Sequence, residues 1–519
     1  YFTFYNCLYV KVKYLKRPST LKVLLFLGTV LSHLRLPATL VGTRTQTNSC
    51  LNWSIVFLRI SVELLVMNNV CKKSLTTIGR RSFSYKSVRR PDISIKRTPT
   101  TPQVLANKAT NEPNLANQIR AKIMSTGPIT VADYMREVLT NPNAGYYMNR
   151  DVFGKDGDFI TSPEVSQIFG ELIALWILIE WRKIGSPSPF QIVELGPGRG
   201  TLTRDILNVL SKFKPGEFSL HMVEISPFLS NMQAQLFCFK HELVEDVAVP
   251  YYQRGETISG IDVFWYKRLE DLPQIFSIVV AHEFFDALPI HKLQLDNGIW
   301  KEVLIDVNVE GGNEFRYVLS KSQTPISQLY QPKANEMRQT LEYSLESDRI
   351  IGLLAERLER DGGIGLVMDY GHNGEKSDTF RAFRKHALHD PLIEPGTADL
   401  TADVDFAHMK RIAEQQGQVI CYGPVEQRFF LKKMEGDARL GLLLENALPE
   451  NKNAIETGYH MLTDSNQMGS RFKFLSMFPA VLKDHLTKFI RITQGENRKY
   501  CKYIYMRQAP MFYVNTKCS

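Results

Sequence analysis

A short apolar strand that runs directly into three closely spaced glycines constrains the fold of this chain more than any other feature. The strand is the segment IVEL at residues 192–195, and it is followed by Gly196, Gly198 and Gly200. Residues 201–210 then have a helical pattern. Glycine lets the backbone approach a ligand closely, and the free N–H groups at the start of the helix face that ligand. We therefore predict a ligand-binding loop between a strand and a helix.

The spacing of the glycines separates two classes of nucleotide site. A dinucleotide fingerprint has the pattern G-x-G-x-x-G. This chain has G-x-G-x-G instead, with Glu194 two residues before the first glycine. That arrangement resembles the first motif of class I S-adenosylmethionine methyltransferases. A dinucleotide-dependent oxidoreductase is the alternative, and the glycine spacing disfavours it.

Strand and helix patterns alternate along the body of the chain, which predicts βαβ units and a parallel sheet of the α/β class. The segment 277–281 is apolar on both faces, as in a buried central strand. We expect Thr130 to cap one helix and Ser162 to cap another, with Pro163 in its first turn. The expected strands are 190–195, 219–225, 261–266, 276–282, 299–306 and 363–369, and the expected helices are 115–126, one from about 130, 162–181, 201–213, 228–238 and 341–360.

In a doubly wound sheet the ligand lies over the carboxyl ends of the strands. The next strand after the glycine loop ends in Glu224, whose carboxylate could accept hydrogen bonds from both hydroxyls of a ribose. A solvated acid at a strand end is the alternative interpretation. The third strand ends near Trp265, which is a candidate for packing against adenine and equally a candidate for the core.

Two acidic segments are candidates for the substrate end of the site. The fourth expected strand runs into Glu283 and Asp286, with two phenylalanines between them, and such a group could hold a cation. The segment 156–164 carries Asp158, Thr161, Ser162 and Glu164. Its plainer interpretation is the capped start of a helix.

Four segments together resemble one family. GKDGDFITSPE (154–164), ELGPGRG (194–200), AHEFFDALP (281–289) and PGTADLTADVDF (395–406) are similar to the MidA family, over about residues 115–474. These are mitochondrial protein-arginine methyltransferases that act as assembly factors of respiratory complex I. The resemblance implies a class I methyltransferase fold, which is a Rossmann-like parallel sheet with helices on both faces. It also implies a helical N-terminal extension and inserted or C-terminal elements specific to the family.

The resemblance further implies S-adenosyl-L-methionine as cofactor and symmetric dimethylation of an arginine in a basic segment of a complex I subunit. Carboxylates beside the arginine would leave one of its nitrogens nucleophilic. A non-catalytic assembly chaperone that keeps a cofactor pocket is the alternative. The candidate catalytic residues are Glu283, Asp286 and Glu164, and the candidate cofactor residues are Glu194, Gly196, Gly198, Gly200, Glu224, Asp158, Thr161, Ser162 and Trp265.

Charge is distributed unevenly along the chain. The net charge is +9 overall, but residues 101–480 contain 38 basic and 50 acidic residues, a net charge of −12. An acidic body argues against a nucleic-acid partner and suits a cationic substrate or a basic protein. The seven cysteines include no C-x-x-C pair and no Cys/His cluster, so we expect neither a disulfide framework nor a metal site.

The ends of the chain are interpreted separately. Residues 1–66 are left unassigned and are expected to lie outside the mature protein; the apolar run 21–31 could also be a signal-peptide core, but it is too short for stable insertion into a membrane. Residues 67–97 are basic, rich in serine and poor in acids, which is typical of a mitochondrial transit peptide, with cleavage expected near Ser84 and a location in the matrix. The remaining boundaries are a linker at 98–114, a helical N-terminal part at 115–189, the methyltransferase domain at 190–478 and an unassigned tail at 479–519.

Overall fold

The computed structural model describes residues 114–152, 154, 157–158, 160–312, 314–330, 336–415 and 417–486. The expected transit peptide, the linker up to residue 113 and the tail beyond residue 486 lie outside these residues.

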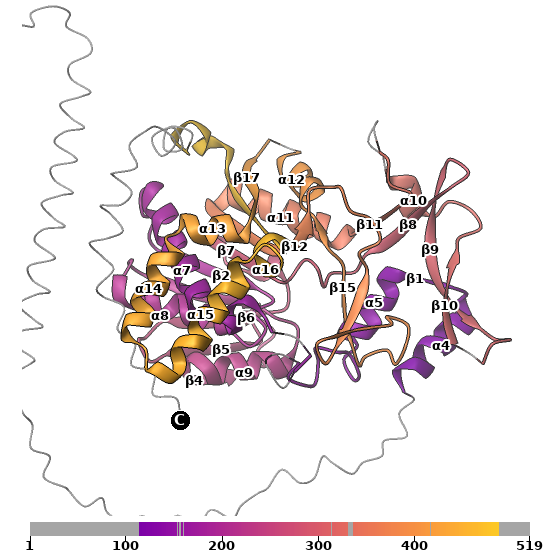
Figure 1. The fold of residues 1–519 in the computed structure, drawn as a ribbon, viewed down its shortest axis with the longest axis horizontal. Helices are drawn as coiled ribbons and strands as arrows, with labels where there is room; N and C mark the ends of the chain where they lie inside the picture. Colours follow the sequence, from indigo (N-terminus) through magenta and orange to yellow (C-terminus); the bar gives the residue numbers. More distant parts are fainter. Residues whose placement is uncertain are drawn as a thin grey trace, which may run out of the picture. The chain divides into compact units, whose positions relative to one another are not determined.

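A large mixed sheet forms the centre of the fold (Figure 1). Five of its strands, β6, β3, β2, β7 and β12, run parallel, as the alternating pattern predicts. The flanking strands β18, β5 and β4 pair antiparallel, and so does β17 with β18. The order is β17 (Val419–Glu426), β18 (Phe472–Pro479), β12 (Gly363–His372), β7 (Ser277–His282), β2 (Phe190–Leu195), β3 (Phe218–Val223), β6 (Asp262–Tyr266), β5 (Gln253–Thr257) and β4 (Cys238–Leu243), with β16 (Val404–Asp405) beside β12.

The central strands β2 and β7 are buried along their whole length, and this burial explains their continuous apolar sequences. Their side chains alternate between two cores. Ile192 and Ile278 enter the core under α7 (Gln167–Lys183) and α8 (Thr201–Phe213), whereas Val193 and Val279 enter the core under α11 (Leu345–Asp361) and α12 (Phe406–Glu414). Helices therefore cover both faces of the sheet, and the predicted α/β fold is confirmed.

The remaining helices extend the first of these two layers. Helices α13 (Gln427–Lys433), α14 (Gly436–Asn446), α15 (Pro449–Thr463) and α16 (Met468–Arg471) contact one another, and α14 also packs on α7. A buried ion pair joins α14 to α7, since Arg439 donates two hydrogen bonds to the carboxylate of Glu171. Helix α9 (Pro227–Phe237) follows β3 and packs into the same core as α7 and α8 through Ala234 and Phe237, whereas η1 (Leu269–Asp271) follows β6 and packs into the other core through Leu269.

The start of the long helix expected at 162–181 is different in the structure. The helix is interrupted at Ser166, whose backbone is extended at φ −158° and ψ 131° and whose side chain caps α7. The short helix before it, α6 (Ser162–Val165), begins at Ser162 as expected, but its N-cap is Thr161 and not Ser162. Glu164 completes this start by accepting a hydrogen bond from the backbone N–H of Thr161 at 3.4 Å. Thr130 caps α5 (Val131–Thr140), as expected.

A second group of elements is built from the N-terminal helices and two insertions. The strand expected at 299–306 exists as β9 (Ile299–Asn308), but it belongs to a separate antiparallel sheet with β1 (Ile129–Thr130), β8 (His291–Asp296), β10 (Glu314–Leu319) and β11 (Thr340–Tyr343). The helix expected from residue 341 is likewise wrong at its start, because β11 precedes α11 and Ser344 caps the helix. A third small sheet contains β13 (Arg381–Arg384), β14 (Ala387–His389) and β15 (Asp399–Thr401).

These insertions share a core with the N-terminal helices. Figure 1 shows α4 (Leu115–Thr126) and α5 beside β1, β9 and β10. Ile119, Tyr134, Ile305 and Leu400 meet in one buried cluster, while the short helix α10 (Pro325–Leu329) contacts β9. Segments that are distant in sequence thus form one body next to the main sheet.

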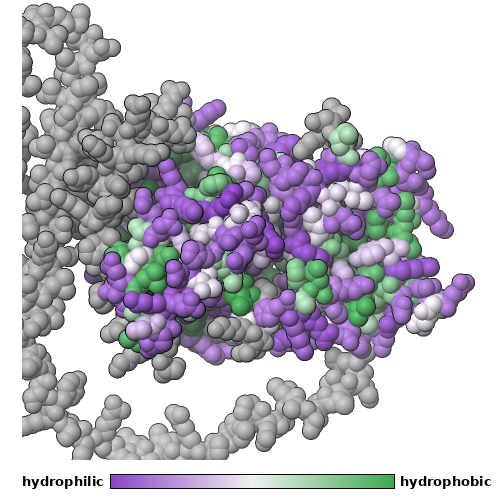
Figure 2. Space-filling model, in the orientation of Figure 1, coloured by the Kyte–Doolittle hydropathy of each residue, from purple (hydrophilic) through white to green (hydrophobic). Residues whose placement is uncertain are grey.

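Hydrophilic side chains cover most of the face drawn in Figure 2, with hydrophobic ones in small groups among them. Within the described residues, no helix is both long and apolar enough to cross a membrane.

The sheet leaves no space for a side chain at Gly371, and this gives a test of the packing. A Cβ there would lie 2.5 Å from the carbonyl oxygen of Val404 and 2.5 Å from a ring carbon of Phe406. We expect Gly371→Ala to lower the free energy of unfolding by about 1–3 kcal/mol. Gly352 in α11 is the control, since a Cβ there meets nothing within 4 Å, and Gly352→Ala should raise this free energy by about 0.5–1 kcal/mol. Urea unfolding of both variants checks the pair, and shifts in the same direction would contradict it.

Candidate active site

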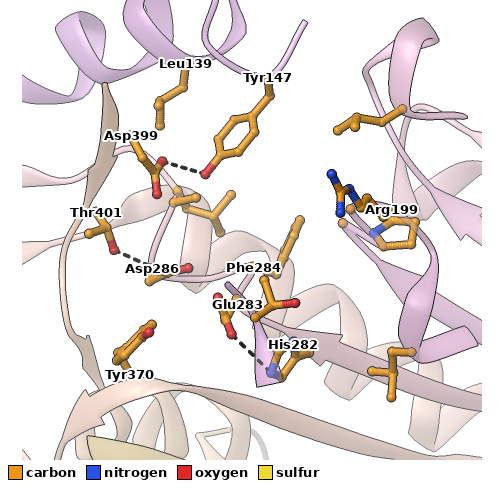
Figure 3. A pocket seen from close by; sticks show the side chains of 18 of the residues that line it. Leu139, Tyr147, Arg199, His282, Glu283, Phe284, Asp286, Tyr370, Asp399 and Thr401 are labelled. Atoms are coloured by element: carbon orange, nitrogen blue, oxygen red, sulfur yellow. Dashed lines mark hydrogen bonds and ion pairs between the residues drawn. The ribbon is translucent and has the colours of Figure 1, made fainter. Parts of the chain in front are cut away.

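A cavity of about 560 Å³ lies at the carboxyl ends of the parallel strands. Its floor is formed by the loops that follow β2 and β7, and its other walls come from α5, the 161–164 segment and the β13–β15 insertion. Figure 3 shows its side chains converging from these separate elements. This is the place where a doubly wound sheet binds its ligand.

The glycine loop has the backbone geometry that only glycine adopts easily. The φ angles of Gly196, Gly198 and Gly200 are 61°, 54° and 83°. A Cβ at Gly196 would lie 2.8 Å from the ring of Phe284. Gly196 and Gly198 line the cavity, but Gly200 does not; it is the left-handed N-cap of α8 and packs against Phe237.

Two buried glutamates line the cavity beside this loop, as expected. Glu194 accepts a hydrogen bond from the hydroxyl of Thr203, and burial raises the pKa of Glu194 to about 8. Glu224 accepts hydrogen bonds from the backbone N–H of Ser226 at 2.8 Å and from the amide of Gln233 at 3.1 Å. Burial raises the pKa of Glu224 to about 7. Since a carboxylate has about four acceptor positions, Glu224 can still accept hydrogen bonds from a ligand.

Trp265 is not placed to pack against a bound adenine. Its side chain is 0% exposed in the core, stacks on Phe237 and donates a hydrogen bond to Gln233 at 2.8 Å. Gln233 in turn donates to the carbonyl of Gly198 and to the carboxylate of Glu224. Trp265 therefore reaches the cavity only through Gln233, and the plainer core interpretation is the correct one.

The 156–164 segment divides into residues that face the cavity and residues that do not. Thr161 and Glu164 line it, whereas Asp158 and Ser162 do not. The Asp158 carboxylate accepts hydrogen bonds from the Tyr146 hydroxyl at 2.8 Å and the Lys385 backbone N–H at 2.7 Å. It therefore ties this segment to the β13–β14 turn instead of meeting a ligand in the cavity.

The side chain of Ser162 is fully buried and has no hydrogen-bond partner among the described residues. Its main chain, however, lies beside the carboxylate of Glu283 and lowers the pKa of that group against the effect of burial. The segment therefore contributes to the acidic end of the cavity through its main chain.

Glu164 is paired with an arginine of the glycine loop. Arg199 donates a hydrogen bond to Glu164 at 3.1 Å and holds Asp151 with two further nitrogens. The charge of Glu164 is thus neutralised within the site. This pairing distinguishes Glu164 from the other two candidate catalytic acids.

Glu283 and Asp286 both line the cavity and lie near each other on the loop after β7 (Figure 3). Glu283 has a φ of 49°, which is in the left-handed region that costs a non-glycine residue about 1–3 kcal/mol. Glu283 Oε1 and Asp286 Oδ1 are buried and have no hydrogen-bond partner among the described residues. His282 Nε2 lies 3.4 Å from Glu283 Oε1 without the geometry of a hydrogen bond.

The electrostatics of this end are those of buried, unneutralised acids. Burial and the neighbouring Asp286 raise the pKa of Glu283 well above its usual range, and burial also raises the pKa of Asp286. Burial lowers the pKa of His282 to about 3, so that its imidazole is neutral at pH 7. Arg381 also lines the cavity, but its guanidinium donates a hydrogen bond to Asp403 at 2.7 Å.

Several residues of this end were not identified from the sequence. The hydroxyl of Thr401 donates to Asp286 at 2.8 Å, and the hydroxyl of Tyr147 donates to Asp399 at 2.6 Å. Burial raises the pKa of Asp399 to about 7. Asp399 and Thr401 lie within the fourth family segment, 395–406, so the family resemblance could have pointed to them. No sequence motif pointed to Tyr147 or Tyr370, because Tyr147 lies in a turn and Tyr370 lies inside a strand.

The comparisons with known proteins agree with this geometry. A family model described as a putative S-adenosyl-L-methionine-dependent methyltransferase matches residues 172–425. The mitochondrial protein arginine methyltransferase NDUFAF7 homolog of Drosophila melanogaster is 63% identical over 429 residues, which cover 80% of this chain and 98% of that relative. The chain belongs to the MidA family of S-adenosyl-L-methionine-dependent methyltransferases.

A human relative supports the same assignment, and a solved bacterial structure shares the fold. The mitochondrial protein arginine methyltransferase NDUFAF7 of Homo sapiens is 48% identical over 364 residues, covering 69% of this chain and 82% of that protein. A likely methyl transferase from Burkholderia thailandensis, solved with S-adenosyl-homocysteine, has the same fold with a TM-score of 0.56 at 22% identity, covering 71% of this chain and 92% of that one. The family, its cofactor and a mitochondrial location are thereby confirmed as the sequence predicted.

The cavity fits S-adenosyl-L-methionine. Gly196 and Gly198 line the cavity without side chains, so that the backbone can meet the cofactor, and Glu224 would accept hydrogen bonds from its ribose. The volume lies within the range of about 300–1,000 Å³ that is typical of cofactor sites. Among the described residues, no group of three or more His, Cys, Asp or Glu side chains could hold a metal ion.

Substitution of Glu224 should weaken cofactor binding, whereas substitution of Trp265 should leave it nearly unchanged. Glu224→Ala removes two charge-assisted hydrogen bonds to the ribose, each worth about 1.5–3 kcal/mol, so cofactor binding should weaken at least roughly tenfold. Trp265→Phe leaves the lining unchanged and should keep the affinity within about threefold. It should nevertheless lower the free energy of unfolding by about 1–3 kcal/mol, because Gln233 Oε1 loses its buried donor. Calorimetry and urea unfolding test both variants, and normal cofactor binding by Glu224→Ala would refute the ribose assignment.

Proposed function

We propose that this protein is a mitochondrial protein-arginine methyltransferase that dimethylates an arginine symmetrically on a complex I subunit and thereby serves complex I assembly. The curated relatives carry the name of protein arginine methyltransferases. The observation that carries the proposal is the pair of buried, unpartnered carboxylate oxygens of Glu283 and Asp286 in the same cavity as the glycine loop.

A guanidinium suits this pair better than a neutral group does. Arginine offers five N–H donors in a planar fork and stays protonated at neutral pH. Two adjacent carboxylates can each accept from a different edge of this fork. The ring of Phe284 lines the cavity beside the pair and would supply apolar and cation–π contacts. Phe285 meets this ring edge to face at 5.2 Å but is buried in the core behind it.

The geometry of the cavity assigns a role to each end. S-adenosyl-L-methionine, when bound, supplies an electrophilic methyl group. The glycine loop and Glu224 would hold the cofactor, while Glu283 and Asp286 would hold the guanidinium with one nitrogen directed at the methyl. Holding both partners at reacting distance is the main contribution of the protein.

The guanidinium nitrogen that gains a methyl gives up one proton, and we assign this proton to Glu283 Oε1. Burial and the charge of Asp286 raise the pKa of Glu283 well above its usual range. A carboxylate with a raised pKa is a competent general base near neutral pH. Burial raises the pKa of Asp286, and the hydrogen bond from Thr401 opposes this shift and so favours the charged form beside the substrate.

Charge at Glu283 should be essential for transfer but not for cofactor binding. We expect Glu283→Gln to bind S-adenosyl-L-methionine near normally and to lose methyl transfer by roughly 10²-fold or more, the scale of losing one transition-state partner. Glu283→Gln and Asp286→Asn together should be strongly non-additive. The assay uses labelled cofactor and mitochondrial extract, with the labelled protein and residue identified by mass spectrometry. Full activity in both single variants would move the substrate site to Glu164.

The raised carboxylate pKa values predict a pH dependence. Below pH 7 the Asp399 carboxyl is largely protonated, and it becomes ionised as the pH rises through about 7. An ionised cluster attracts a cationic arginine more strongly, so kcat/KM for the protein substrate should rise between about pH 6 and pH 8. In Asp399→Asn, the part of this rise near pH 7 should be lost. Profiles are measured at saturating cofactor, because Glu224 also titrates near pH 7; a flat wild-type profile would contradict the assignment.

A further inference from the structure

The loop that carries Glu283 and Asp286 is not held by the sheet ladder. Strand β7 ends at His282, which lies opposite Met368 of β12. The ladder continues for one more step, since the backbone N–H of Glu283 donates to the carbonyl of Met368 at 3.0 Å. Beyond that point the chain turns away with Glu283 at φ 49°, so the next N–H groups need other partners.

One side chain supplies those partners. Asp369, the next residue of β12, directs Oδ2 at three consecutive backbone N–H groups: Phe284 at 3.2 Å, Phe285 at 2.9 Å and Asp286 at 3.3 Å. Its other oxygen, Oδ1, accepts from the N–H of Tyr370 at 2.9 Å. The side chain is 0% exposed and is not part of the cavity lining.

This convergence fixes the shape of the loop. Three successive N–H groups can reach one oxygen only if the backbone between them curls tightly around it, as in an anion-binding nest. Hydrogen bonds to an ionised acceptor are roughly twice as strong as neutral ones. Because Glu283 and Asp286 flank this curl, their Cα positions are set by the Asp369 carboxylate.

We infer that Asp369 is a positioning residue for methyl transfer, holding Glu283 and Asp286 so that one guanidinium can bridge their two unpartnered oxygens. This inference rests on the proposed function and names how its substrate site is assembled. Asp369 does not line the cavity, so it would act through the loop backbone.

Asp369 also belongs to the buried acidic cluster of this site. Burial and the charges of Asp286 and Glu283 raise the pKa of Asp369 well above its usual range, and the backbone N–H groups of Phe285 and Asp286 oppose this shift. The other groups that act on the acidic pair are Glu164, Asp399, Asp403 and Arg381.

The kinetic test compares two substitutions of Asp369. Asp369→Asn keeps the volume but removes the charge, whereas Asp369→Glu keeps the charge but displaces the carboxylate. Both should reduce kcat by roughly tenfold or more while cofactor affinity stays within about threefold. Wild-type kcat in both variants, or a loss of cofactor affinity as large as the loss of kcat, would overturn the inference.

The control is Glu302→Gln, which changes a carboxylate that is also buried, at 1% exposure, but lies in the antiparallel sheet and bonds His291. It should leave kcat unchanged. A decrease in kcat equal to that of Asp369→Asn would show that burial of any acid has the same effect and would overturn the inference.

A readout without activity separates this inference from the proposed function. Amide hydrogen exchange should show the N–H groups of residues 284–286 protected in the wild type and exposed in Asp369→Ala, while the strand 277–282 stays protected. Unchanged protection at 284–286 would overturn the positioning role. If the wild type methylates no arginine but Asp369→Ala loses this protection, the proposed function fails while the positioning of the acidic loop by Asp369 stands.

Discussion

The end of the parallel hydrogen-bond ladder is the constraint on which the site depends. Strands β2, β3 and β7 lead into the loops of the site, and the first residue after each strand still donates a backbone hydrogen bond to the neighbouring strand. The N–H of Gly196 donates to the carbonyl of Val223 at 3.0 Å, that of Glu224 to Tyr266 at 2.9 Å and that of Glu283 to Met368 at 3.0 Å. The first residue of every loop is therefore fixed by the sheet. Buried N–H groups beyond these residues require partners, and the loops take the shapes that supply them.

The same constraint explains what could be predicted from the sequence. Glu194, the glycines, Glu224 and Glu283 adjoin apolar strands, so that local pattern places them at one edge of the sheet. Asp369 and Tyr147 could not be found in this way, because their partners are separated from them by more than eighty residues in the chain. Trp265 was ambiguous because a residue near a strand end can point to the core as easily as to the cavity.

The errors in the expected secondary structure have a similar origin. Ser166 interrupts an apolar stretch that is periodic on both sides, and only its extended backbone and its cap of α7 reveal two helices. The helical pattern begins at residue 341, but residues 340–343 form β11 instead, because they pair with the distant strand β8. The sequence pattern identified β9 as a strand but none of the other strands of its sheet, β1, β8, β10 and β11, so the separate antiparallel sheet was not predicted.

The walls of the cavity come from nearly the whole length of the described chain, from Leu139 and Tyr147 near its start to Arg471 near its end. Contacts between such distant segments form late, because closing long loops costs entropy that is recovered only when the segments meet. A chain in which these segments have not yet met has its glycine loop and its acids in the right order but lacks the cavity. Such a chain therefore has no site that can hold cofactor and substrate together.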